Sequence, residues 1–183
     1  MLFPKRGWLV TALVLFVLIS CSNSKKEVEN AVTDRDSMPL MATTGVDSYI
    51  SDSGVVRYHI IAEMWDIFDK KDPSYWAFEK GLKLEQIDLD RNVVATLTAD
   101  TAYYYDREEK WELRGNVHSV NVNDEEFETE LLFWNQKRER IYSDKRIRVK
   151  QKNQYIVGTG FESNQDFTRY TIKQTEGMFP IQE

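Results

Sequence analysis

Residues 110–122 read KWELRGNVHSVNV, and apolar and polar side chains alternate along this stretch. Trp111, Leu113 and Val117 fall on one face together with Gly115, and the charged residues and the histidine fall on the other. A period of two is typical of a β-strand that has one apolar and one polar face. The stretch therefore predicts a strand that packs one side onto a core.

Two further stretches alternate in the same way. In residues 54–64 (GVVRYHIIAEM), the apolar face is formed by Val56, Tyr58, Ile60, Ala62 and Met64. In residues 126–134 (EFETELLFW), the face opposite the glutamates is formed by Phe127, Thr129, Leu131 and Phe133. Short polar segments separate the strands, as antiparallel hairpins require, and no stretch after Gly45 carries a long helical period. The sequence predicts an all-β antiparallel meander.

The N-terminal segment has the features of an export signal. Lys5 and Arg6 precede an apolar run that ends at Ile19, and this run is shorter than the roughly 20 residues needed to span a bilayer. The run is followed by Ser20 and by Cys21, the single cysteine of the chain. Leu18-Ile19-Ser20-Cys21 resembles the bacterial lipobox, which makes Cys21 a candidate lipid-attachment residue. The alternative is an uncleaved anchor with an incidental cysteine, and either reading predicts a protein tethered to a membrane.

The rest of the chain has the length and composition of one folded domain. The predicted organisation is a signal or anchor over residues 1–21, a polar flexible tether over 22–46, a β-domain over 47–176 and a short tail over 177–183. The formal net charge of −6 argues against nucleic acid as a partner, because phosphate binding needs a basic surface. With one cysteine, no internal disulfide can form.

Signals of catalysis or metal binding are poor. His59 and His118 fall on polar strand faces far apart in the sequence, and no nucleophile–base set can be assembled with them. Asp88-Leu89-Asp90 begins like a calcium loop, but valine and alanine stand where the loop needs its glycine and its bidentate glutamate. We expect a protein that is not an enzyme and that has no metal site and no cofactor.

Three short motifs follow one another along the chain. They are G-x-x-x-Y-x-I-x-A (Gly54, Tyr58, Ile60, Ala62), A-D-x-A-x-Y (Ala99, Asp100, Ala102, Tyr104) and L-x-G-x-V (Leu113, Gly115, Val117). In this order they resemble the motifs of the LptC family, a periplasmic component of lipopolysaccharide export. The resemblance extends over residues 47–174. It implies a sheet bent into an open trough, called a β-jellyroll or β-taco, in which the acyl chains of the lipid lie.

The resemblance also implies a function and a set of lining residues. The expected protein accepts lipopolysaccharide from an inner-membrane ABC transporter complex and passes it to a periplasmic bridge protein of the same fold. The expected lipid-binding lining is Tyr58, Ile60, Ala62, Tyr75, Trp76, Phe78, Trp111, Leu113, Phe127, Leu131 and Phe133. The alternative is that these residues fill the core of a closed β-sandwich, in a membrane-tethered lipoprotein with a binding or assembly role.

Edge strands are the second element that this function needs. A trough that docks onto another trough must leave an edge strand available for pairing. The last strands carry few charges and no proline before Pro180, and the partner edge is expected at Tyr155, Val157, Phe161, Tyr170 and Ile172. The strand over 55–64 is expected at the opposite end, nearer the transporter. The alternative is that the chain's own tails cap both edges.

Overall fold

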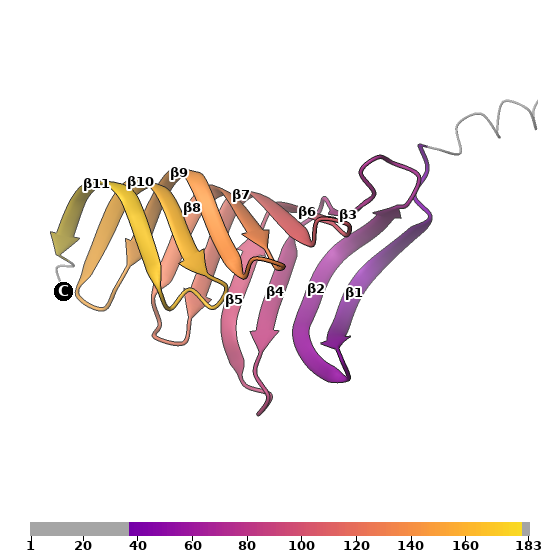
Figure 1. Cartoon of the computed structure of the whole chain (residues 1–183), viewed down its shortest axis with the longest axis horizontal. Helices are drawn as coiled ribbons and strands as arrows, with labels where there is room; N and C mark the ends of the chain where they lie inside the picture. Colours follow the sequence, from indigo (N-terminus) through magenta and orange to yellow (C-terminus); the bar gives the residue numbers. More distant parts are fainter. Residues whose placement is uncertain (1–36, 181–183) are drawn as a thin grey trace, which may run out of the picture. The chain divides into compact units, whose positions relative to one another are not determined.

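The computed structural model describes residues 37–180 and confirms the predicted all-β antiparallel architecture (Figure 1). All of its strands belong to one 11-stranded sheet. They are β1 (Met41–Asp52), β2 (Val55–Phe68), β3 (Tyr75–Phe78), β4 (Leu82–Ile87), β5 (Val93–Ala99), β6 (Thr101–Tyr105), β7 (Lys110–Asn121), β8 (Glu126–Asn135), β9 (Arg140–Lys150), β10 (Gln154–Asn164) and β11 (Tyr170–Pro180). Within residues 37–180, no helix has the length and apolar character to cross a membrane.

The strands follow one another from one end of the sheet to the other. β1 pairs with β2 at the N-terminal end, and β7 to β11 form a continuous meander at the C-terminal end (Figure 1). Between β2 and β7 the chain crosses the sheet twice, and each crossing consists of two short strands. The first crossing is formed by β3 and β4, and the second by β5 and β6. β3 and β6 pair over one half of this region, and β4 and β5 pair over the other half.

A line of backbone irregularities crosses the sheet near the middle of its strands. The β7–β8 register shifts between Arg114 and Val117, and the β8–β9 register shifts between Thr129 and Phe133. Two hydrogen bonds continue this line between the short strands. Gly81 N–H, between β3 and β4, donates to the Asp100 carbonyl (2.8 Å), and Asp100 N–H, between β5 and β6, donates to the Gly115 carbonyl (3.0 Å). Bulges of this kind bend a strand. The bends therefore fold the sheet along one crease.

Gly115 shows why this crease needs particular residues. Its φ is +73°, a left-handed value that side chains with a Cβ rarely adopt, and an added Cβ would lie 2.7 Å from Asp100 Oδ2. Glycine at this position lets β7 turn while both of its halves stay paired. This is a physical role for the glycine of the L-x-G-x-V motif.

The crease brings two layers of the sheet face to face with their apolar sides inward. Ring contacts join the layers, with Tyr58 edge-on to Trp134 (5.3 Å between centroids) and Phe127 against Phe161 (5.6 Å). The free ends of the layers carry hairpin turns, which form two rims. We name the rim of the β6–β7, β8–β9 and β10–β11 turns the first rim, and that of the β1–β2, β4–β5, β7–β8 and β9–β10 turns the second rim.

The folded unit is longer than the sequence predicted at both ends. β1 begins at Met41, inside the predicted tether, and β11 continues to Pro180, inside the predicted tail. Because β1 pairs with β2 over nearly its whole length, β2 is covered and β1 is the edge of the sheet. The predicted signal segment, with Cys21, lies outside the described residues.

Candidate functional site

A groove of about 700 Å³ lies between the two rims in the N-terminal half of the folded unit. Its apolar lining comes from both layers and consists of Ile50, Tyr58, Ile60, Trp76, Leu84, Ile87, Tyr104 and Trp111. Its polar lining comes mostly from the turns and consists of Asp52, Arg57, Gln86, Glu109, Gln136, Glu139 and Gln165. The groove thus has an apolar floor below a polar mouth, which is the arrangement that suits an amphiphile.

A row of aromatic rings gives the floor a fixed shape. The Tyr104 ring lies 4.9 Å from Trp76 and 4.8 Å from Trp111, measured between centroids. Phe78 continues the row at 5.7 Å from Trp111. The first two pairs are tilted and the third is stacked, and rings packed at these distances support each other. The packing of neighbouring rings therefore holds these side chains in place.

Two tyrosines join the floor to the mouth. Burial raises the pKa of Tyr58, and a hydrogen bond with the Gln136 side chain opposes the rise in part. Burial also raises the pKa of Tyr104, with a smaller contribution from the carboxylate of Glu109. Both phenols are therefore neutral at physiological pH, so they offer hydrogen bonds at the mouth without placing a charge beside the apolar floor.

The C-terminal half of the interior is closed by the protein itself. Phe127, Phe161 and Phe167 pack on one another there, and each is 2% exposed or less. Phe167 belongs to residues 164–169, the last residue of β10 and the turn that joins it to β11, which we name the strap. The strap reaches from the first rim to the second, because its Phe167 carbonyl accepts a hydrogen bond from Asn121 Nδ2 (2.9 Å).

Most of the predicted lining residues do face the interior. Ile60, Ala62, Phe78, Trp111, Leu113 and Phe127 are buried in the core cluster, and Tyr58 and Trp76 pack against it. Trp76 lines the groove with Tyr58, Ile60 and Trp111, whereas Phe127 lies in the closed half. Contact of any of these residues with lipid stays a prediction.

Three predicted lining residues lie on the outer face. Tyr75 packs on Phe68 outside the sheet, since Trp76 next to it takes the inward position. Leu131 and Phe133 point outward because the irregularity after Thr129 reverses the alternation of β8. Phe133 stacks on Tyr142 (5.2 Å) instead.

The sequence analysis missed several inward positions. They include Ile50, Leu84, Ile87 and Tyr104, which line the groove, and Trp65, Leu132 and Trp134, which belong to the core or pack against it. Residues 131–134 read LLFW, and this uninterrupted apolar run does not show which of two faces is buried. Tyr104 was part of a motif, yet it was not assigned to the lining. Its spacing of two from Ala102, on the buried face of β6, is the signal that identifies it.

The free edges of the sheet are β1 and β11. β10 pairs with β9 on one side and with β11 on the other. The prediction that Tyr155, Val157 and Phe161 lie on an edge is therefore wrong. Tyr170 and Ile172 do lie on the edge strand. Large apolar side chains are exposed on both edges, with Tyr49 at 61% on β1 and Met178 at 63% on β11.

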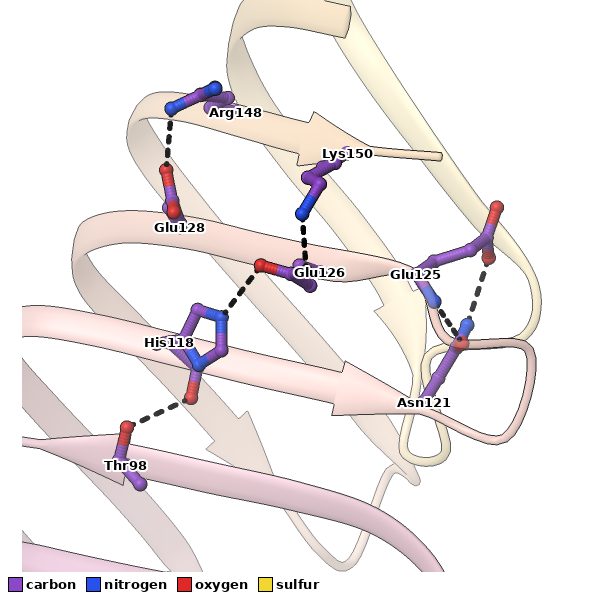
Figure 2. A network of polar contacts seen from close by, with 8 residues as sticks. All are labelled: Thr98, His118, Asn121, Glu125, Glu126, Glu128, Arg148 and Lys150. Atoms are coloured by element: carbon purple, nitrogen blue, oxygen red, sulfur yellow. Dashed lines mark hydrogen bonds and ion pairs between the residues drawn. The ribbon is translucent and has the colours of Figure 1, made fainter. Parts of the chain in front are cut away.

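An ion-pair network covers part of the outer face (Figure 2). His118, Glu126 and Glu128 place one ligand atom each within 4.8 Å of one another. Lys150 Nζ lies 2.7 Å from Glu126, and Arg148 lies 3.4 Å from Glu128, so both carboxylates already have a cation. The pKa of Glu126 is lowered, and the largest cause is the hydrogen bond from Lys150. The arrangement is that of cross-strand ion pairs and does not favour a metal centre.

His59 ties the edge strand to the sheet. Its Nε2 lies 2.7 Å from Asp47 Oδ1 on β1, and its Nδ1 lies 2.8 Å from Glu85 Oε2 on β4. Tyr49 stacks on the imidazole at 4.2 Å. The hydrogen bond with Asp47, and next that with Glu85, raise the pKa of His59 above its usual 6.5. When protonated, the imidazole donates to both carboxylates and so clamps β1, β2 and β4 together.

This clamp predicts a pH dependence of stability. Because the pKa of His59 is higher in the folded protein, the stabilisation is fully present below about pH 6.5 and is lost as the pH rises through the folded-state value. We expect the free energy of urea unfolding to fall over that interval, and to fall less in His59→Gln. The protection factors of the β1 amides, which correct for the intrinsic rise of exchange with pH, should fall over the same interval. Equal pH profiles for the two proteins would contradict the assignment.

Comparison with known families agrees with the geometry. The family model described as LptC, "Lipopolysaccharide-assembly, LptC-related", matches residues 9–176, which is most of the chain. No curated protein matches the sequence.

Proposed function

Because the chain belongs to the LptC family and so has a role in lipopolysaccharide transport, we propose that its groove receives acyl chains of lipopolysaccharide. The observation that carries this proposal is the groove itself, which has an apolar floor and a polar mouth. Acyl chains are driven into such a site by about 25 cal/mol for each Å² of apolar surface removed from water. Sugar and phosphate groups stay at the mouth, in contact with solvent.

The proposed route is from an inner-membrane ABC transporter complex to a periplasmic bridge protein of the same fold. The chain is held in the periplasm by its N-terminal segment, either through a lipid on Cys21 or through an uncleaved anchor. ATP hydrolysis by the transporter supplies the energy. The chain supplies an apolar surface that shields the acyl chains from water on the way.

The two edge strands are the proposed docking sites for these partners. An edge strand presents unpaired N–H and C=O groups, and a second sheet can extend it by β-augmentation. β1 is the proposed edge toward the transporter and β11 the proposed edge toward the bridge protein. The exposure of Tyr49 and Met178 on these edges supports the proposal, because a partner strand would cover both.

One observation favours the second candidate, a tethered lipoprotein with a closed β-sandwich. The interior of the C-terminal half is filled by buried aromatic side chains, as in an ordinary sandwich core. Under this reading, the groove is a surface hollow and binds no lipid. The two candidates make different predictions for photo-cross-linking.

A photoreactive amino acid in place of Tyr58 or Tyr104 should cross-link to lipopolysaccharide in living cells. The same amino acid at Phe133 or Tyr142, on the outer face, should give no lipid adduct. Immunoblots of the full chain, probed also for lipopolysaccharide, measure the adducts. Adducts at all four positions, or at none of them, would refute lipid binding in the groove.

A further inference from the structure

The strap shares one backbone feature with the other two turns of its rim, but a different type of residue occupies it. Glu109, Glu139 and Phe167 occupy equivalent places in the three turns, with left-handed φ values of 49°, 49° and 57°. Their N–H groups donate to the carbonyls of Asp106, Gln136 and Asn164 in the same way. The two glutamates are exposed, whereas Phe167 is 2% exposed.

The Phe167 ring is held in the interior by contacts with both layers. It lies 5.1 Å from Phe127 on β8 and 6.3 Å from Phe161 on β10, between centroids. Its carbonyl accepts the buried hydrogen bond from Asn121, across the opening between the rims. A bulky residue in the left-handed region is uncommon and has to be stabilised by its surroundings. Here the inward packing of the ring supplies that stabilisation.

Phe167 lies where the groove stops. A small cavity of about 10 Å³ adjoins the groove, and the two share Leu84, Gln86 and Gln165 as lining residues. Phe167 lines this small cavity and does not line the groove. The order of features along the interior is thus the groove, the small cavity, the Phe167 ring and the closed aromatic cluster.

From this order we infer that Phe167 is the residue that limits how far an acyl chain enters the interior. The inference rests on the proposed function and makes it more specific. A chain that reaches the ring has filled the apolar space open to it, and further methylenes must stay at the mouth. Each methylene inside contributes about a fourfold gain in affinity, so the position of the stop decides which chain lengths are bound fully.

The experiment reads the depth of the acyl chain directly. The full chain in lipid nanodiscs is photolabelled with fatty acids that carry a diazirine at the methyl end, from decanoic to octadecanoic acid. Mass spectrometry then locates the label. In the unaltered protein, the label is expected on groove residues such as Trp111 and Leu84 at every chain length. In Phe167→Ala, the longest acids are expected to label β10 around Phe161 as strongly as the groove.

Two further variants control for loss of packing. Phe161→Ala removes a ring from the same cluster without opening the small cavity, and it should leave the label in the groove. Phe167→Leu keeps an apolar side chain and should give an intermediate depth even if the alanine variant does not fold. Label on β10 in the unaltered protein, or the same labelling in all variants, would contradict the inference that Phe167 limits how far the acyl chain enters. Absence of label from the groove in every protein would instead overturn the proposed function.

Discussion

Replacing Trp134 by alanine is expected to lower the free energy of unfolding by about 3–5 kcal/mol, as for other fully buried aromatic side chains. Trp134 is 2% exposed, and it lies between Tyr58 on one layer and Ile141 on the neighbouring strand. Its indole Nε1 has no hydrogen-bond partner among the described residues, so its removal leaves no polar group orphaned. The expected loss is therefore that of apolar contacts and of the cavity left behind.

The neighbouring residue provides the matched control. Phe133 lies on the outer face, where its ring stacks on Tyr142 and makes a cation–π contact with the ammonium group of Lys110. Such contacts contribute about 1 kcal/mol or less each at partly exposed positions, so Phe133→Ala should have a small effect. Urea unfolding followed by circular dichroism measures both. Equal losses would contradict the placement of the irregularity in β8.

The same pair of residues shows how far the sequence predicts this fold. Alternation in residues 110–122 correctly predicts a strand with Trp111, Leu113 and Val117 inward. It fails after Thr129, where one irregularity exchanges the two faces of β8. A bulge depends on how the neighbouring strand is paired, which is a non-local property. The four apolar residues that follow satisfy either face equally well.

The groove and the strap were beyond prediction for a related reason. Residues 164–166 are polar, as the segments between strands are expected to be, but nothing local shows that Phe167 folds back under them. Its position depends on Asn121 and Phe127, which are distant in the sequence and reach it only once the sheet is creased. The groove likewise exists because rim turns from separate hairpins stop short of each other. The alternation of apolar and polar residues predicted an apolar interior without showing which half of it is open.

Asn121 is the residue through which the second rim holds the strap, and Asn121→Asp is expected to destabilise the protein by about 3 kcal/mol. The side chain is 4% exposed, and its Oδ1 accepts hydrogen bonds from the N–H groups of Asn123 (2.9 Å) and Glu125 (3.0 Å). Its Nδ2 donates to Glu125 Oε2 (2.9 Å) and to the Phe167 carbonyl (2.9 Å). Figure 2 shows Asn121 directed at Glu125.

Aspartate at this position keeps both accepted hydrogen bonds and loses both donated ones. It also sets a carboxylate against the carboxylate of Glu125 and leaves the Phe167 carbonyl without its buried donor. Stability should recover in part at acidic pH, because a protonated carboxyl group donates again. Asn123→Asp, an exposed change in the same turn, should be nearly neutral. Urea unfolding as a function of pH measures these effects.

Hydrogen exchange separates the local effect of Asn121→Asp from a global one. If the hydrogen bond to Phe167 holds the strap, exchange in residues 164–169 should accelerate at neutral pH while β4 and β5 stay protected. The strap would then open without unfolding of the sheet, because β10 and β11 stay paired beyond it. Uniform acceleration throughout the sheet would show that Asn121 stabilises the fold as a whole. In that case, the strap is an ordinary part of the core and cannot move independently of it.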